Sequence, residues 1–294
     1  MRDRVRTTLG LARRAWRALG GDPAARAELE AYLLDQVVRR PIVYEDSRGL
    51  RYVLRPGENA RAFLEADGNY EVAETRFCER YLQPGMTALD AGAHIGLYTL
   101  LFARLVGPAG RVYAFEPAPA NHRRLVENLA LNAAENVVVE QAALYREAGR
   151  VTLHLFPERL GSWHSLGEPS LADPSFPYAT IAPSEAVEVD AITLDEYTAE
   201  RGIERIDLLK VDVEGAEADV LAGGRTTLAA GAVAAVLFEV SKPQTEALGH
   251  DPADAFEELR AAGFSVHALE PDGRPGAEAA EPGPRYANYV ALRA

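Results

Sequence analysis

Cysteine is nearly absent from this sequence, because Cys78 is the only one among 294 residues. A single thiol cannot form an internal disulfide, so we expect a protein of a reducing compartment, the cytoplasm. Long apolar runs are also lacking, and no stretch approaches the roughly 20 apolar residues of a membrane-spanning helix. The first residues carry arginines but no uninterrupted apolar stretch, which makes them a poor signal peptide.

Positive charge is also scarce. The chain has 31 Lys and Arg residues against 44 Asp and Glu residues, a formal net charge of -13. A protein that binds nucleic acid without sequence preference needs a concentrated basic surface to neutralise phosphates. The charge balance therefore argues against a nucleic-acid partner and fits a small or neutral substrate. Hydrophobic residues make up 48% of the chain, enough for the core of one large α/β domain with an extra subdomain.

The N-terminal 70 residues are predicted to form a helical and hairpin cap. Val5, Leu9 and Trp16 recur at helical spacing, while arginines occupy the other side of the same helix. Three roles are open to this basic amphipathic helix: contact with an anionic membrane, packing on its own domain, or packing on a second copy as a homodimer. The segments PIVYED and RYVLRP, separated by SRG, are typical of a hairpin.

Residues 71–294 differ in pattern, because short apolar strands alternate with helical segments. Such alternation is typical of βαβ units and a mostly parallel sheet. We expect a Rossmann-like, doubly wound α/β fold with seven strands, the last of them entering as part of a hairpin. The expected strands are 87–91, 111–116, 136–142, 207–213, 233–240, 264–269 and 287–292, and the expected helices are 95–106, 118–132, 217–230 and 252–262.

Two segments interrupt this alternation. Residues 151–200 form a long insertion between the third and fourth predicted strands, and insertions of this length are more often functional than idle. We expect this insertion to form a lid or a wall for the substrate. The Gly/Pro-rich segment EPDGRPGAEAAEPGPR, residues 270–285, is expected to be a mobile loop.

The segment LDAGAHIG, residues 89–96, leads from a predicted strand through a glycine turn into a helix. Its spacing differs from the dinucleotide fingerprint G-x-G-x-x-G, and Asp90 precedes the first glycine. A carboxylate repels a pyrophosphate, whereas it attracts an ammonium or sulfonium group. The loop therefore favours S-adenosylmethionine over NAD as the cofactor.

The ends of the next two strands extend the predicted cofactor site. Glu116 lies about 20 residues beyond the loop at a strand end, where an acid is placed to bind both ribose hydroxyls. Residues at the end of the third strand are placed to border the adenine. The predicted cofactor site comprises Asp90, Gly92, Ala93, His94, Gly96, Glu116, Pro117, Gln141, Ala142 and Asp212.

Three blocks, residues 89–132, 187–197 and 206–224, together resemble the FkbM family of S-adenosylmethionine-dependent methyltransferases. The glycine loop of that family usually reads D-x-G-A-N-x-G, so His94 stands where asparagine is common. An imidazole can still hydrogen-bond the methionine carboxylate, with a charge that depends on pH. The resemblance implies O-methylation of a hydroxyl group on a small molecule such as a sugar, a glycoside or a polyketide-type natural product. The N-terminal 70 residues lie outside the resemblance.

The predicted fourth strand ends in a concentration of charge: Lys210, Asp212, Glu214 and Glu217. Because side chains alternate along a strand, the first three share one side, and Lys210 can pair with an acidic neighbour. Three roles are open: Asp212 as an acid–base group for the acceptor hydroxyl, Asp212 and Glu214 as ligands of Mg²⁺, or a structural network. We favour a pocket role for Asp212 and Glu214 over metal binding, and a structural role for Glu217 at the start of the next helix.

His164 and Glu239 are further catalytic candidates. His164 lies in the insertion, and its imidazole is the side chain whose ordinary pKa lies nearest neutrality. Glu239 ends the fifth predicted strand and so reaches the edge of the same site. Ser162 and Trp163 flank His164, and together with His164 and Glu214 they are expected to bind the acceptor.

Two other classes of function are open to the sequence. A nicotinamide-dependent oxidoreductase is disfavoured by the glycine spacing and by Asp90. A non-catalytic binding protein on a methyltransferase fold is disfavoured by the acidic residues retained at the strand ends.

Overall fold

The computed structural model describes residues 41–55, 71–156, 164–167, 183–283 and 286–293. The chain divides into two compact units, residues 1–70 and 71–294. In the first unit, β1 (Ile42–Glu45) and β2 (Arg51–Leu54) form an antiparallel hairpin at the place where the sequence predicts one. Its turn is closed by Asp46, whose side chain accepts hydrogen bonds from the backbone of Arg48 and Leu50. The predicted N-terminal amphipathic helix lies outside the described residues.

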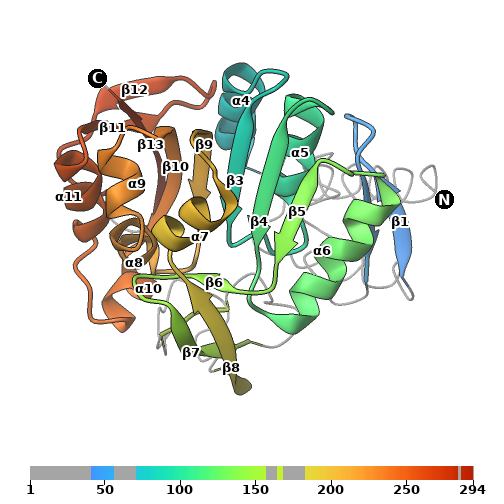
Figure 1. Ribbon diagram of the computed structural model, residues 1–294, viewed down its shortest axis with the longest axis horizontal. Helices are drawn as coiled ribbons and strands as arrows, with labels where there is room; N and C mark the ends of the chain where they lie inside the picture. The colour runs from blue at the N-terminus through green and yellow to red at the C-terminus, as the bar shows by residue number, and fades with distance from the viewer. Residues whose placement is uncertain (1–40, 56–70, 157–163, 168–182, 284–285, 294) are drawn as a thin grey trace, which may run out of the picture. The chain divides into compact units, whose positions relative to one another are not determined.

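The second unit is built on an eight-stranded sheet (Figure 1). Five neighbouring strands run parallel, while β13 is antiparallel to both of its neighbours. In spatial order the strands are β12 (Pro275–Glu278), β11 (Phe264–Leu269), β13 (Tyr286–Arg293), β10 (Val233–Ser241), β9 (Ile206–Val211), β3 (Thr87–Ala91), β4 (Arg111–Phe115) and β5 (Val137–Glu140).

All seven predicted strands are present in this sheet, so the predicted α/β doubly wound fold is confirmed. The eighth strand, β12, corrects the expectation that residues 270–285 form only a loop. A turn at 270–274 reverses the chain, and β12 then pairs antiparallel with β11 at the sheet edge. The glycines and prolines indicated the turn. The edge strand gave no comparable signal, because its residues are mostly exposed and lack an apolar face.

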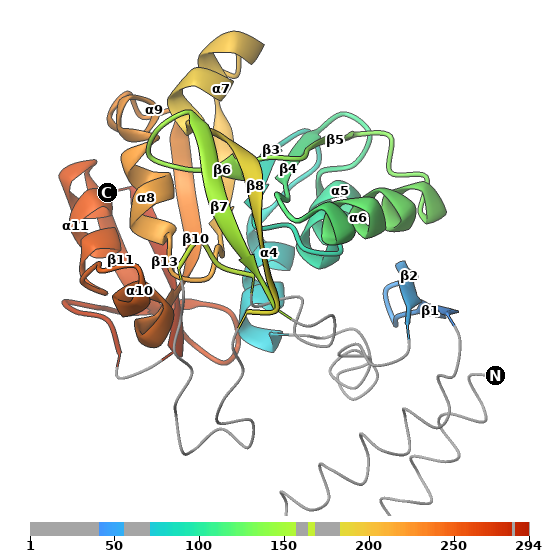
Figure 2. The same ribbon diagram turned by 90° about the horizontal axis from the view of Figure 1, so that it is seen from below.

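Helices cover both faces of the sheet (Figure 2). On one face lie α4 (Val72–Tyr81), α5 (Leu97–Val106) and α6 (Pro119–Leu131). On the other face lie α7 (Leu194–Arg201), α8 (Glu217–Ala222), α9 (Arg225–Ala229) and α11 (Asp254–Ala261), and α10 (Lys242–Ala247) follows β10 directly. The core between the sheet and the second group of helices contains Leu209, Val211, Val220, Phe238, Phe256 and their neighbours. Among the described residues, no helix is long and apolar enough to cross a membrane.

The predicted helix over 217–230 is in fact two helices, α8 and α9, separated at Gly223 and Gly224. A Cβ atom at Gly223 would lie 2.1 Å from the backbone oxygen of Tyr145, and one at Gly224 would lie 2.7 Å from the side chain of Leu194. The break therefore lets other segments approach the backbone closely. Such a contact depends on tertiary packing and has no local signature.

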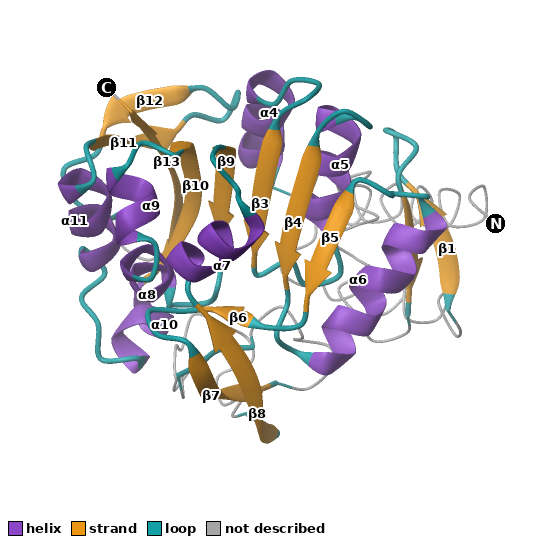
Figure 3. Cartoon of the chain, viewed as in Figure 1, coloured by secondary structure: helices purple, strands orange, loops and turns teal. Residues whose placement is uncertain are grey.

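A second, smaller sheet takes in the two strands that the structure describes within the insertion predicted at 151–200 (Figure 3). It consists of β6 (Ala143–Leu144), β7 (Gly149–Leu155) and β8 (Glu185–Ile192), in the order β6–β8–β7. Strands β7 and β8 form an antiparallel pair, and β6 runs parallel to β8. Because β6 follows closely on the end of β5, the small sheet begins beside the carboxyl ends of the main sheet's strands.

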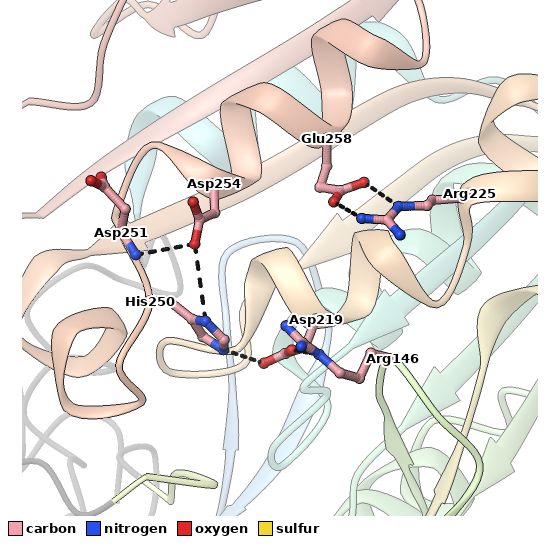
Figure 4. Close-up of polar contacts among 7 residues, drawn as sticks. All are labelled: Arg146, Asp219, Arg225, His250, Asp251, Asp254 and Glu258. Atoms are coloured by element: carbon pink, nitrogen blue, oxygen red, sulfur yellow. Dashed lines mark hydrogen bonds and ion pairs between the residues drawn. The ribbon is translucent and has the colours of Figure 1, made fainter.

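Polar contacts connect the segment between β6 and β7 to the helices behind it (Figure 4). Asp219, fully buried in the first turn of α8, accepts a hydrogen bond from Arg146 Nε, and His250 Nε2 lies 2.9 Å from its other oxygen. Nearby, Arg225 of α9 pairs with Glu258 of α11 and so connects these two helices. These contacts fix the connection between β6 and β7 against α8 and the start of α11.

Candidate functional site

A cavity lies at the carboxyl ends of β3, β4 and β9. The strand order reverses between β3 and β9, and open α/β sheets bind their ligands at such a switch point. The glycine loop, the segments after β4 and β5, the small sheet and the segment after β9 all contribute to its walls. The lining residues are Gly92, His94, Phe115, Glu116, Pro117, Asn121, Ala142, Ala143, Leu144, Leu153, His164, Leu166, Asp212, Val213 and Glu214.

The glycine loop lies directly against the end of β9. Gly92 has a φ of 81°, and its N–H and that of Ala93 both donate to the carbonyl of Phe115. A Cβ atom at Gly92 would lie 1.8 Å from the carbonyl oxygen of Asp212. Only glycine fits here, because the contact is between two backbones that have no side chain to move aside.

Asp90 stands behind the loop and does not line the cavity. Its side chain is buried, with Oδ2 accepting a hydrogen bond of 2.6 Å from Thr99 and Oδ1 3.7 Å from Lys210 Nζ. Burial raises the pKa of Asp90, and the nearby Lys210 ammonium opposes that shift. Gly96 has a φ of 92° at the start of α5, where a Cβ atom would meet Leu125 at 2.6 Å.

Glu116 joins the glycine loop to the start of α6. Its two carboxyl oxygens accept hydrogen bonds from the backbone of His94 at 2.7 Å and of Ala118 at 2.9 Å, and the side chain of Asn121 bonds to it as well. Burial raises the pKa of Glu116 to about 8, although these hydrogen bonds oppose the shift. Each carboxyl oxygen has two lone pairs, so Glu116 can still accept from a ligand in the cavity.

The two histidines that line the cavity are both neutral at physiological pH. Burial lowers the pKa of His94 to about 3, and the nearby cation of Arg124 adds to the shift. Burial also lowers the pKa of His164 to about 4. The backbone N–H of Phe156 donates to His164 Nδ1 at 3.0 Å, so the neutral ring carries its proton on Nε2. His164 therefore presents a hydrogen-bond donor.

Lys210 is held near the end of β9 between two carboxylates and a ring. Its Nζ donates to Asp212 Oδ2 at 2.9 Å, lies 3.7 Å from Asp90, and lies 4.7 Å from the ring centre of Tyr98. The predicted pairing of Lys210 with an acidic neighbour is thus confirmed. Burial alone would lower the pKa of Lys210, but the carboxylates of Asp212 and Asp90 raise it.

Side-chain alternation does not continue as far as the sequence predicts. The strand ends at Val211, and Glu214 and Gly215 then take left-handed conformations with φ of 57° and 106°. The Glu214 carbonyl accepts a hydrogen bond of 2.8 Å from Ser165 Oγ, and its carboxyl accepts one from Gln244 Nε2. Burial and the charge of Asp212 raise the pKa of Glu214 well above its usual range. Burial of Glu214 at the cavity therefore favours the protonated form of its carboxyl.

Two more acids surround this turn. Glu217 Oε1 accepts hydrogen bonds from the backbone of Val213 at 3.1 Å and of Gly215 at 3.2 Å, an arrangement that suits the structural role predicted for it. Glu239 is half-buried on β10 and does not line the cavity, and burial together with the charge of Asp212 raises its pKa to about 9. Among the described residues, no group of three or more His, Cys, Asp or Glu side chains is placed to hold a metal ion.

The structure brings together most of the predicted site. Ser162 and Trp163 lie outside the described residues, and Gln141 is exposed and does not line the cavity. Asp90, Ala93 and Gly96 shape the loop from behind. The predicted residues that line the cavity are Gly92, His94, Glu116, Pro117, Ala142, His164, Asp212 and Glu214.

Sequence reasoning missed the apolar wall of the cavity. Leu153 of β7 and Leu166 of the insertion line it together with Phe115 and Leu144. Alternation of polar and apolar residues along GRVTLHL indicates that Leu153 is buried. No local pattern indicates which buried surface it meets.

Comparison with known proteins identifies the family. Residues 90–266 match the methyltransferase FkbM domain. The chain belongs to the FkbM methyltransferase family. This confirms the resemblance seen in the sequence.

Several curated methyltransferases are similar to this chain at modest identity. The 31-O-demethyl-FK506 methyltransferase FkbM of Streptomyces tacrolimicus is 33% identical over 159 residues, covering 48% of this chain and 60% of that protein. The 2-O-methyltransferase NoeI of Sinorhizobium fredii (strain NBRC 101917 / NGR234) is 30% identical over 153 residues, covering 50% and 60%. The methyltransferase sdnD of Sordaria araneosa is 37% identical over 153 residues, covering 46% and 59%. The chain thus spans about 60% of the length of these curated relatives.

Proposed function

We propose that this FkbM family protein is an S-adenosylmethionine-dependent O-methyltransferase that acts on a hydroxyl of a small molecule such as a sugar, a glycoside or a polyketide-type compound. The observation that carries the proposal is the cavity in which Gly92, Glu116 and Asp212 meet at the switch point of the sheet. Two relatives named for O-methyl transfer support oxygen as the acceptor atom. Family membership also favours methyl transfer over nicotinamide chemistry.

The residues of the cavity fit S-adenosylmethionine. Phe115, Leu144, Leu153 and Leu166 form an apolar wall suited to adenine, and Glu116 has lone pairs left for ribose hydroxyls. Asp212 on the cavity wall and the buried Asp90 behind it supply negative charge for an ammonium or sulfonium group. Asp90 Oδ1 has no hydrogen-bond partner within the described part of the chain. When bound, this cofactor supplies an electrophilic methyl group on a positively charged sulfur.

Three groups of the loop region are assigned to holding the cofactor. Glu116 accepts hydrogen bonds from the ribose hydroxyls while it keeps the backbone of the glycine loop in place. Gly92 allows the cofactor and the end of β9 to approach the same backbone. His94 is neutral, so it hydrogen-bonds the methionine carboxylate without a charge that changes between pH 5 and 8.

Asp212 is the residue that we assign to the acceptor proton. It lines the cavity, and a carboxylate is able to accept a proton. The ammonium of Lys210, whose Nζ donates to Asp212 Oδ2 at 2.9 Å, balances the negative charge of this carboxylate. Glu214 and His164 line the same cavity and are assigned as hydrogen-bond donors, because burial favours the protonated form of Glu214 and His164 carries its proton on Nε2. These two orient the acceptor oxygen, and Asp212 accepts the proton that the hydroxyl loses. Alignment of the acceptor oxygen with the methyl group supplies a further large part of the rate.

The proposed function is tested with purified protein, S-adenosylhomocysteine and a panel of sugars, glycosides and polyketide-type alcohols. Calorimetry should show binding of S-adenosylhomocysteine, and a cofactor site that binds only NAD would contradict the proposal. Asp212→Asn should lower kcat by on the order of 10²-fold or more, because it removes a positioned base, and this effect should be much larger than its effect on the affinity for S-adenosylhomocysteine. His164→Gln serves as the comparison and should lower kcat less, because an amide still donates a hydrogen bond.

Chelation decides between the two roles open to Asp212 and Glu214. Turnover that EDTA abolishes and Mg²⁺ restores would assign these acids to a metal ion. Turnover that is indifferent to EDTA supports the acid–base role of Asp212. Binding of S-adenosylhomocysteine without turnover on any acceptor would support a binding protein on this fold.

A further inference from the structure

Glu71 lies outside the family match, which begins at residue 90, and it has an unusual backbone conformation. It precedes α4 with φ of 50° and ψ of 73°, in the left-handed region that non-glycine residues seldom occupy. Three of the four described non-glycine residues with positive φ are Glu71, His94 and Glu214. His94 and Glu214 line the cavity. A strained backbone conformation of this kind persists where the surrounding structure holds the residue in place.

Three successive contacts connect Glu71 to Asp212. The hydroxyl of Tyr98 donates a hydrogen bond of 2.6 Å to Glu71 Oε2. The ring of the same tyrosine lies 4.7 Å from Lys210 Nζ, within the range of a cation–π contact. Lys210 Nζ in turn donates to Asp212 at 2.9 Å. Tyr98 thus contacts Glu71 through its hydroxyl and Lys210 through its ring, and Lys210 is the hydrogen-bond partner of Asp212.

The charges at the two ends of this series affect each other. Burial raises the pKa of Glu71 to about 7, and the carboxylate of Asp212 is the next cause. Lys210 and the hydrogen bond from Tyr98 act in the opposite direction. Glu71 therefore lies close enough to Asp212 for the two charges to interact.

Lys210 lies near two acids, and the position of the Tyr98 ring affects which of them its ammonium contacts. Its Nζ is 2.9 Å from Asp212, at the cavity, and 3.7 Å from Asp90, behind the glycine loop. A lysine side chain is flexible, so the ring against its ammonium restricts where that ammonium lies. The ring is in turn fixed by the hydrogen bond to Glu71.

We propose that Glu71 is a positioning residue of the methyl-transfer site, a role that rests on the proposed function. It holds Tyr98 against Lys210, and Lys210 then keeps the carboxylate of Asp212 oriented at the cavity. Glu71 itself touches neither cofactor nor acceptor in this role.

The test compares Glu71→Ala, Glu71→Gln and Tyr98→Phe in the full-length protein. Glu71→Ala and Tyr98→Phe both remove the hydrogen bond, and each should lower kcat at least about tenfold, because misplacement of a reacting group is costly. The affinity for S-adenosylhomocysteine should change by less than about threefold, since the cofactor contacts remain. Glu71→Gln should recover most of the rate, because its amide oxygen can still accept from Tyr98. Glu74→Ala, which removes a buried acid one turn further along α4, is the matched control and should retain the wild-type rate.

A double-mutant cycle separates positioning from a general structural effect. In an Asp212→Asn background, Glu71→Ala should lower kcat no further, because the residue on which it acts has been neutralised. Urea unfolding of the cofactor-free protein gives a second readout, in which the effects of Glu71→Ala and Asp212→Asn should be non-additive. Additive effects in both measurements, or a Glu71→Gln variant no more active than Glu71→Ala, would overturn the inference. A wild-type protein that binds no S-adenosylhomocysteine would instead refute the proposed function.

Discussion

Replacement of Gly92 by alanine tests the close approach between the glycine loop and the end of β9. The residue has a φ of 81°, and an added Cβ atom would lie 1.8 Å from the carbonyl oxygen of Asp212 and 2.9 Å from its carbonyl carbon. A left-handed conformation costs an alanine about 1–2 kcal/mol. Relief of the clash requires a backbone shift, which typically costs about 1–3 kcal/mol more. We therefore expect Gly92→Ala to lower the free energy of unfolding by about 2–5 kcal/mol.

Gly231 provides the matched control. Its φ of 79° is nearly the same, but a Cβ atom there would have nothing within 4 Å. Gly231→Ala should therefore show only the conformational cost of about 1–2 kcal/mol. The difference between the two variants isolates the contact with Asp212.

Thermal unfolding and calorimetry measure both consequences. A change of 1 kcal/mol shifts the Tm of a domain of this size by about 2–4 °C, so Gly92→Ala should unfold about 2–12 °C below Gly231→Ala. Its affinity for S-adenosylhomocysteine should also fall, because the loop and Asp212 must separate, while Gly231→Ala should bind as the wild type does. Equal Tm values for the two variants would refute the close packing of loop and strand end.

Two other acids give predictions of different kinds. Glu116→Ala should weaken binding of S-adenosylhomocysteine by about 1–3 kcal/mol, because the ribose hydroxyls lose a buried hydrogen-bond partner, and unchanged affinity in calorimetry would remove Glu116 from the site. Glu217→Gln should change how stability depends on pH, because burial raises the pKa of Glu217 from 4.5 to about 7 in the folded protein. The wild type therefore loses stability as pH rises from about 4.5 through 7, whereas glutamine keeps the Oε1 acceptor and does not ionise. In urea unfolding the variant should be more stable than the wild type at pH 8, by on the order of 1–3 kcal/mol, and this gain should shrink toward pH 4.5; a gain that does not depend on pH would contradict it.

Much of the fold could be predicted because its signals are local. Each strand of the main sheet except β12 is a short apolar run with turn residues at its ends, and such runs alternate with helical segments. The glycine loop and the acids at the strand ends could be predicted for a related reason. Parallel strands end at the same edge of the sheet, so Asp90, Glu116 and Asp212 had to lie near one another.

The sequence by itself thus determined the sheet, the position of the candidate site and about half of the residues that line its cavity. Only the tertiary structure decided what those residues are able to do. The pKa of Glu214 is raised because its carboxyl is buried near the charge of Asp212, and His164 is a donor because the backbone of Phe156 occupies its other nitrogen. Protonation and tautomer depend on burial and on hydrogen-bond partners that are distant in the chain, and no local pattern carries that information.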